Sequence, residues 1–132
     1  MAIANFVKCD HEDLALIENA TSGVNTILKS LDFNIDYEIL VPNHAYQACR
    51  NTVDYVAKRI CDKVLTCDIP FPVYNDDIII QRIMDCVTEK TKIALIDTVT
   101  SPTGIKMPFE KIVNLLENKG VMVLLDAAHG IG

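Results

Sequence analysis

Short unbroken runs of apolar residues alternate along this chain with segments in which apolar residues recur every three or four positions. The runs predict strands, at 37–41, 63–67, 93–97 and 121–126. The last run, from Val121 to Leu125, is apolar at every position, which is typical of a strand buried on both faces of a parallel sheet. Residues 14–18 form a weaker strand candidate, and residues 1–13 show little periodicity.

The segments between the runs predict four amphipathic helices, each with one apolar stripe. The stripes are Val24, Ile27, Leu28 and Leu31; Cys49, Thr52, Val53, Val56, Ala57 and Ile60; Ile80, Ile83, Met84 and Val87; and Phe109, Ile112, Val113 and Leu116. Since strands alternate with helices, the expected fold is α/β, with three α/β/α layers around a mostly parallel sheet.

Residue types that favour helix ends support these helices. Thr21 or Ser22 is the expected N-cap of the first helix, and Asp76 or Asp77 that of the third. Pro108 suits the first turn of the fourth helix, and Gly120 its C-terminal cap.

Composition restricts the classes of function. The net charge is -6 without a basic cluster, which argues against binding to nucleic acid or to an anionic membrane surface. The apolar runs are too short to cross a bilayer, and the first residues do not resemble a secretory signal. The five cysteines are odd in number and form no C-x-x-C pair, so we expect reduced thiols, no metal site and a cytoplasmic location. Cys49 and Cys61 are expected in the core.

Parallel strands place the loops that follow them at one edge of the sheet. The loops 44–46, 100–104 and 126–129 and the helix start at 20–23 should therefore lie together. They offer backbone N–H groups for a phosphate, an aromatic ring, several hydroxyls, and a carboxylate with an imidazole. Pyridoxal phosphate requires much the same set. Each feature also has a simpler interpretation: a helix start that binds water, an aromatic ring that covers the sheet edge, an aspartate that caps a turn, and a solvated loop histidine.

Three segments resemble the class V aminotransferase family of fold-type I pyridoxal-phosphate enzymes. They are Glu18-Asn-Ala-Thr-Ser-Gly-Val-Asn25, Asp97-Thr-Val-Thr-Ser-Pro-Thr-Gly104 and Asp126-Ala-Ala-His129-Gly130. The order and spacing are closest to the isopenicillin N epimerase-like branch, which is similar to cysteine desulfurases and to fungal carbon–sulfur lyases. The resemblance extends over nearly the whole chain.

The resemblance implies pyridoxal 5'-phosphate as the cofactor. Thr21 and Ser22 would bind its phosphate, and Tyr46, or failing that His44, would stack on its ring. 

At the other loops, Ser101 would lie near the ring and its phenolic oxygen. Asp126 would pair with the pyridinium nitrogen. His129, the expected catalytic residue, would lie against the ring near the substrate, an amino acid.

The resemblance also implies that residues 1–132 are a partial large domain. In the family the lysine that binds the cofactor covalently follows the Asp-x-x-His element, whereas all nine lysines here precede Asp126. The family's N-terminal segment and C-terminal small domain have no counterpart here. We therefore expect an isolated chain without lyase or epimerase activity that self-associates or needs a partner, although the full-length family forms homodimers. 

Two alternatives to an enzyme part remain open. One is a non-catalytic binding or interaction protein. The other is a nucleotide-binding domain, which is weaker because no G-x-G-x-x-G follows a strand.

Overall fold

The computed structural model describes residues 2–32, 34–60 and 63–130. Its helices are α1 (Ala2–Val7), α2 (Ala20–Ser30), α3 (Gln47–Ile60), α4 (Asp76–Cys86) and α5 (Phe109–Glu117), with a 3-10 helix η1 (His11–Asp13). Its strands are β1 (Glu38–Pro42), β2 (Val64–Cys67), β3 (Thr91–Asp97) and β4 (Met122–Asp126). All four predicted strands and all four predicted helices are present, with strand bounds shifted by one or two residues.

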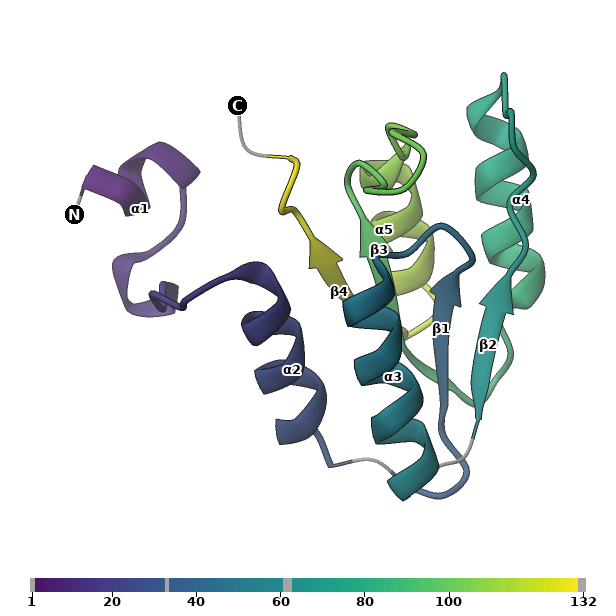
Figure 1. The fold of residues 1–132 in the computed structure, drawn as a ribbon, viewed down its shortest axis with the longest axis horizontal. Coiled ribbons are helices and arrows are strands. Elements are labelled where there is room, and N and C mark those ends of the chain that lie inside the picture. The colour runs from purple at the N-terminus through teal and green to yellow at the C-terminus, as the bar shows by residue number, and fades with distance from the viewer. Residues whose placement is uncertain (1, 33, 61–62, 131–132) are drawn as a thin grey trace.

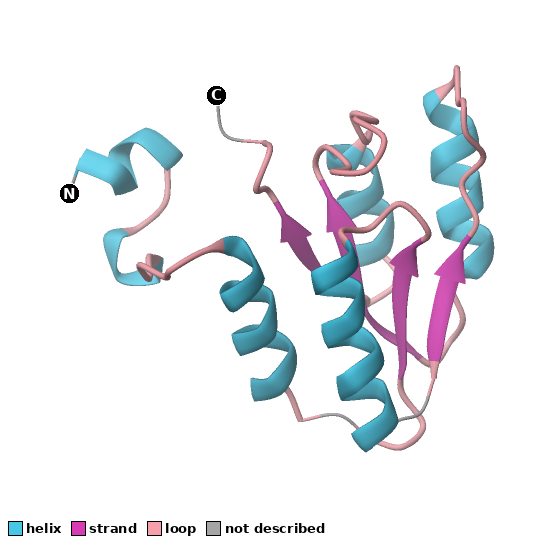
Figure 2. Cartoon of the chain, in the orientation of Figure 1, coloured by secondary structure: helices cyan, strands magenta, loops and turns pink. Residues whose placement is uncertain are grey.

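The four strands form one sheet in the order β2-β1-β3-β4, and every neighbouring pair is parallel. Helices α2 and α3 cover one face of the sheet, and α4 and α5 cover the other (Figures 1 and 2). The predicted three-layer α/β/α fold is therefore confirmed. Because β1 leads into α3 on one face while β3 leads into α5 on the other, the winding reverses between β1 and β3. In sheets of this kind, ligands bind at the carboxyl ends of the strands beside such a reversal.

Alternation along each strand divides the core between the two faces. Residues that pack with α2 and α3 include Ile39, Val41, Ile93 and Leu95. Those that pack with α4 and α5 include Leu40, Ala94 and Ile96. Asp97 continues the series of Ile93 and Leu95, and Asp126 continues that of Leu124, so both carboxylates end strands on the α2 and α3 side. On that side the Asn25 amide donates to the Thr52 hydroxyl (2.8 Å) and joins α2 to α3.

Residues 2–19 differ from the sequence prediction. Residues 14–18 form no strand, and Ala2–Val7 is a short helix that weak periodicity did not predict. The side chains of Leu16 and Ile17 are 80% and 55% exposed, and no strand lies beside them among the described residues. An apolar run forms a strand only where another strand pairs with it, and this segment instead leads directly into α2.

Both predicted N-caps were misplaced. Asn19 caps α2, where its side chain accepts a hydrogen bond from the Ser22 N–H (2.8 Å). Asn75 caps α4 in the same way, accepting from the Asp77 N–H (2.8 Å). In each case the asparagine is the last residue with an extended backbone, and the backbone conformation decides which of several suitable residues caps the helix.

Three smaller features of the helices also differ. Pro108 is the N-cap of α5 rather than part of its first turn, and Gly120 lies beyond the Asn118 C-cap, at a φ of 75°. The buried residues of α4 are Ile79 and Ile83. The predicted stripe residues Ile80, Met84 and Val87 are partly buried beside them. 

The predictions about the cysteines and about membrane spans can be compared with the structure. Cys49 lies in the core as predicted, whereas Cys61 falls outside the described residues. Cys9, Cys49, Cys67 and Cys86 are free thiols. None of the helices in the described ranges is long and apolar enough to span a membrane.

Candidate functional site

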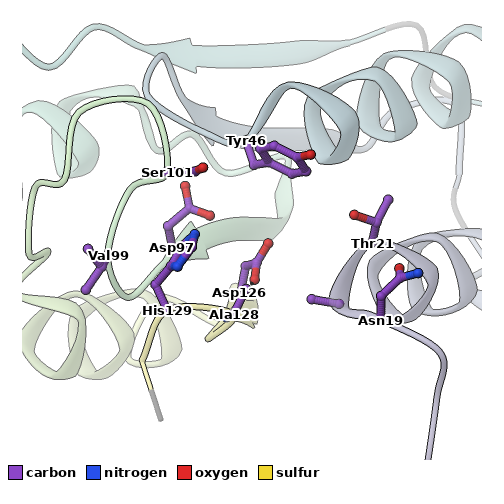
Figure 3. Close-up of a pocket in the computed structure, with 10 residues that line it drawn as sticks. Asn19, Thr21, Tyr46, Asp97, Val99, Ser101, Asp126, Ala128 and His129 are labelled. Carbon is purple, nitrogen blue, oxygen red and sulfur yellow. Dashed lines mark hydrogen bonds between the residues drawn. The ribbon is translucent and has the colours of Figure 1, made fainter. Parts of the chain in front are cut away.

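The loops after β1, β3 and β4 meet the start of α2 around a cavity of about 360 Å³ at the carboxyl edge of the sheet (Figure 3). Ten residues line it: Asn19, Ala20, Thr21, Tyr46, Asp97, Val99, Ser101, Asp126, Ala128 and His129. The cavity lies beside the reversal of winding between β1 and β3. All four predicted segments contribute to it. Parallel strand pairing accounts for the three loops that follow β1, β3 and β4, whereas the start of α2 follows no strand among the described residues.

Two carboxylates form the floor of this cavity. Asp97 and Asp126 are direct partners in the register of β3 and β4, and only 4% and 7% of their surfaces are exposed. In Figure 3 both side chains extend from the strand ends toward Tyr46. Burial, and then the negative charge of Asp126, raise the pKa of Asp97 to about 7.

Asp126 is held by several hydrogen bonds. Its Oδ1 accepts from the Ala128 N–H (3.1 Å), and its Oδ2 accepts from the Cys49 thiol (3.5 Å). Burial, and then the charge of Asp126, raise the pKa of Cys49 to about 12, so this thiol remains a neutral donor. The Thr98 N–H donates to the Asp126 carbonyl oxygen (2.9 Å). By contrast, Oδ2 of Asp97 has no hydrogen-bond partner among the described residues.

The start of α2 lies at the positive end of the helix dipole. The side-chain oxygen of Asn19 accepts a hydrogen bond from the Ser22 N–H, and its carbonyl oxygen accepts one from the Gly23 N–H. Ala20 and Thr21 line the cavity, and no hydrogen bond within the described ranges engages their N–H groups. The first turn of α2 contains no acidic side chain that would neutralise the helix dipole. An anion is therefore favoured at this end of the cavity.

Tyr46, Ser101 and His129 lie at the cavity's rim. Tyr46 is 45% exposed, and Figure 3 shows its ring beside the space between Asp126 and Thr21. Ser101 and His129 are also exposed. The turn that carries His129 is closed by the Gly130 N–H, which donates to the Ala127 carbonyl oxygen (2.9 Å). Gly130 packs so closely on Thr98 that a Cβ at this position would clash with the threonine side chain.

Two predicted site residues, Ser22 and His44, do not line the cavity. The Ser22 N–H already serves the Asn19 cap. His44 is buried, with Nε2 2.9 Å from the Ile69 carbonyl oxygen and Nδ1 3.3 Å from the Thr103 hydroxyl. Since a carbonyl only accepts, Nε2 carries the proton and Nδ1 accepts from Thr103. His44 thus joins the loops after β1, β2 and β3, and for stacking on a ring the structure leaves Tyr46.

Sequence reasoning assigned no role to three residues of this site: Asp97, Cys49 as a partner of Asp126, and the cap Asn19. A signal for Asp97 was present, because it follows Ile93 and Leu95 on one face of a predicted strand. The register that places it opposite Asp126 could not be read from the sequence.

His129 also borders a second, larger hollow of about 660 Å³ between the strand ends and the start of α5. Lys106, Glu110 and Lys111 line this hollow together with Thr98. It contains neither the buried carboxylates nor the free helix start. The smaller cavity is therefore the stronger candidate for a ligand-binding site.

The donor set of the smaller cavity suits one kind of ligand. Free N–H groups at one end favour an anion, and the buried carboxylate of Asp126 favours a protonated nitrogen at the other end. The Tyr46 ring offers a face for a planar group between them. A flat, protonated heterocycle that carries a phosphate has these features, and pyridoxal phosphate is such a molecule.

Comparison with known proteins gives a consistent result. The family model for "Aminotransferase class-V" matches residues 1–132. A probable chloroplastic L-cysteine desulfhydrase of Arabidopsis thaliana is 28% identical over 98% of this chain and 30% of its own length. Isopenicillin N epimerase of Streptomyces clavuligerus is 25% identical over 99% of this chain and 33% of its own length. The chain therefore spans about a third of the curated relatives that it matches.

Solved structures show the same fold. A cystine C–S lyase in complex with cysteine persulfide superposes with a TM-score of 0.86 at 19% identity, over 98% of this chain and 35% of the lyase. A mutant of that lyase has glycine covalently linked to its pyridoxal-phosphate cofactor. It superposes with a TM-score of 0.80 at 20% identity, over 98% of this chain and 34% of the mutant's chain. The described part of this chain thus corresponds to a portion of a fold-type I large domain.

Proposed function

The chain belongs to the aminotransferase class V family, and from this premise we propose that residues 1–132 are the central cofactor-binding portion of a pyridoxal-phosphate-dependent enzyme. The enzyme would act at the α-carbon of an amino acid or at its carbon–sulfur bond, as a lyase or epimerase. The similarity to a cysteine desulfhydrase and to a cystine C–S lyase supports a sulfur-containing amino acid as the substrate class.

One observation carries the proposal: a single cavity is lined by the first residues of α2 at one end and by the buried Asp126 at the other, with Tyr46 beside it. When bound, pyridoxal phosphate supplies a ring that withdraws electrons from a substrate amine. Asp126 would hold a proton on the ring nitrogen. The N–H groups of Ala20 and Thr21, with the Thr21 hydroxyl, would bind the phosphate.

The residues at the rim would act on the ring and on the substrate. Tyr46 would cover one face of the ring and exclude water from it. Ser101 and His129 would lie near the phenolic oxygen and the amino acid, where an imidazole is suited to moving a proton. The clash that any side chain at residue 130 would cause with Thr98 supports a fixed position for the turn that carries His129.

None of the ten lining residues is a lysine. We therefore propose that residues 1–132 hold the cofactor without a covalent bond, and that turnover needs an amine from outside them. Borohydride treatment in the presence of pyridoxal phosphate should fix no label at one specific lysine. Mapping the reduced protein by peptide mass spectrometry checks this, and a single stoichiometrically labelled lysine would contradict it.

The proposal is tested by titrating pyridoxal 5'-phosphate into the chain and following its absorbance. Thr21→Ala should weaken binding about tenfold, as expected for loss of one hydrogen bond to a charged group. Thr26→Ala is the matched control, because Thr26 lies in the same helix, donates to the Ser22 carbonyl oxygen and is exposed away from the cavity. Equal binding by the wild type and Thr21→Ala would contradict the phosphate site, and no saturable binding would refute the proposal.

A second candidate, a role in protein interaction, is favoured by the N-terminal segment. Phe6 and Leu16 are 71% and 80% exposed, and α1 lies apart from the sheet (Figure 1). Apolar side chains exposed in this way favour contact with another chain. Self-association should therefore be visible by sedimentation and should weaken in a Phe6→Ser, Leu16→Ser double variant. A monomer at all concentrations would leave only the cofactor-binding proposal.

A further inference from the structure

Asp97 is the one buried side chain of the cavity to which the family-based roles give no task. Its surface is 4% exposed, and its Oδ2 has no hydrogen-bond partner among the described residues. A buried polar atom without a partner costs free energy unless a proton or ligand compensates it. Asp97 also lines the cavity, so a bound molecule could provide that compensation.

The groups that face Asp97 come from each neighbouring element. Asp126 lies opposite it on β4, and the Cys49 thiol on α3 contacts Asp126. Tyr46 and His129 line the same cavity, and no lysine or arginine among the described residues does. Since no cation compensates the pair, ionising both carboxyl groups at once is unfavourable. Asp126 accepts hydrogen bonds from Ala128 and Cys49, whereas Oδ2 of Asp97 has no donor among the described residues, so Asp97 is the member that keeps a proton.

We propose that Asp97 keeps a proton before the cofactor binds and gives it up when a protonated ring nitrogen binds at Asp126. This inference rests on the proposed function and adds to it a specificity for a cationic heterocycle. If the ring arrives neutral, the Asp97 proton can pass to the ring nitrogen. If the ring arrives protonated, the proton leaves to solvent. In both cases Asp97 ends as a carboxylate, and binding releases one proton more than it would without Asp97.

The test compares the wild-type chain with Asp97→Asn, which keeps the shape of the side chain but cannot ionise. Pyridoxal 5'-phosphate is titrated into each protein calorimetrically, in two buffers with different ionisation enthalpies, to count protons. With the pKa of Asp97 near 7, the wild type at pH 6 should release about half to one proton more than Asp97→Asn. At pH 8.5 this difference should fall to roughly a tenth or less, because Asp97 is then already ionised. The control Glu38→Gln, a buried acid outside the cavity, should match the wild type.

A second measurement guards against an indirect effect of the substitution. Carboxyl ¹³C NMR of the cofactor-free wild type should give Asp97 a titration midpoint near 7. A midpoint near 4 would overturn the inference whether or not the cofactor binds. Equal proton release by the wild type and Asp97→Asn would overturn it while leaving the proposed function intact. Absence of saturable binding by the wild type would overturn both.

Discussion

Two buried carboxylates lie at opposite ends of the same sheet, and they differ in their hydrogen-bond partners and in the direction of their pKa shifts. Glu38 begins β1 and is 5% exposed, while Asp97 ends β3 and is 4% exposed. Glu38 accepts a hydrogen bond from the Thr88 hydroxyl and pairs with Lys63 (3.1 Å). The Thr88 hydrogen bond, with help from Lys63, lowers the pKa of Glu38 against the opposing effect of burial.

Asp97 has no such compensation, and its pKa is raised to about 7. Similar exposure of the two residues therefore does not fix the cost of a carboxylate, which depends on how strongly the charged group is desolvated and on which groups surround it. At the amino edge of the sheet the partners are fixed and the charge supports the fold. At the carboxyl edge the charge is left uncompensated beside a cavity, as is common where a ligand completes a site.

The substitution Asp97→Asn should have the largest effect on stability. Because the pKa of Asp97 is raised, the folded state binds more protons than the unfolded state between about pH 4 and 7, and wild-type stability falls as pH rises through that window. Asp97→Asn should therefore be more stable than the wild type at pH 8, on the order of 2–4 kcal/mol. Urea unfolding without cofactor measures the gain, which should shrink as the pH falls from 7 toward 4. A less stable Asp97→Asn at pH 8 would show that Asp97 supports the fold.

Glu38→Gln should act in the opposite direction. A lowered pKa contributes stability that is present above the unfolded pKa and is lost as the pH falls through the folded value. Glu38→Gln should therefore cost about 1–2 kcal/mol at pH 7, since Thr88 can still donate to the amide oxygen and the exposed Lys63 is solvated. Unfolding curves between pH 3 and 7 should show the loss narrowing toward the acid end. A loss that does not depend on pH would assign the effect to packing rather than to charge.

The sequence predicted the layers of the fold but only part of the site. Strand and helix periodicity is local, so runs such as 93–97 and 121–126 were placed within two residues. The loop that brings Tyr46 to the cavity followed from parallel pairing alone. The partnership of Asp97 with Asp126 depends on strand register, and the burial of His44 depends on contacts with Ile69 and Thr103. Neither is encoded within one segment.

The two N-caps, too, could not be identified from the local sequence alone. Asn19 and Asn75 cap α2 and α4 with the same hydrogen-bond length, 2.8 Å, but their surroundings differ. The first turn of α4 contains Asp76 and Asp77, which already neutralise its dipole, whereas the first turn of α2 contains no acid and borders the cavity. The positive end of α2 is thus the one left available to an anion.

Replacing each cap with alanine separates stability from binding. Asn19→Ala and Asn75→Ala should each cost about 1 kcal/mol of unfolding free energy, the usual price of a lost N-cap. Only Asn19→Ala should also weaken binding of pyridoxal 5'-phosphate, by roughly fivefold, because loosening the first turn of α2 misaligns the N–H groups of Ala20 and Thr21. Thermal unfolding and absorbance titration of the two variants in parallel measure both quantities. If both variants lose affinity equally, the start of α2 has no special part in the site, and the phosphate must be held elsewhere in the cavity.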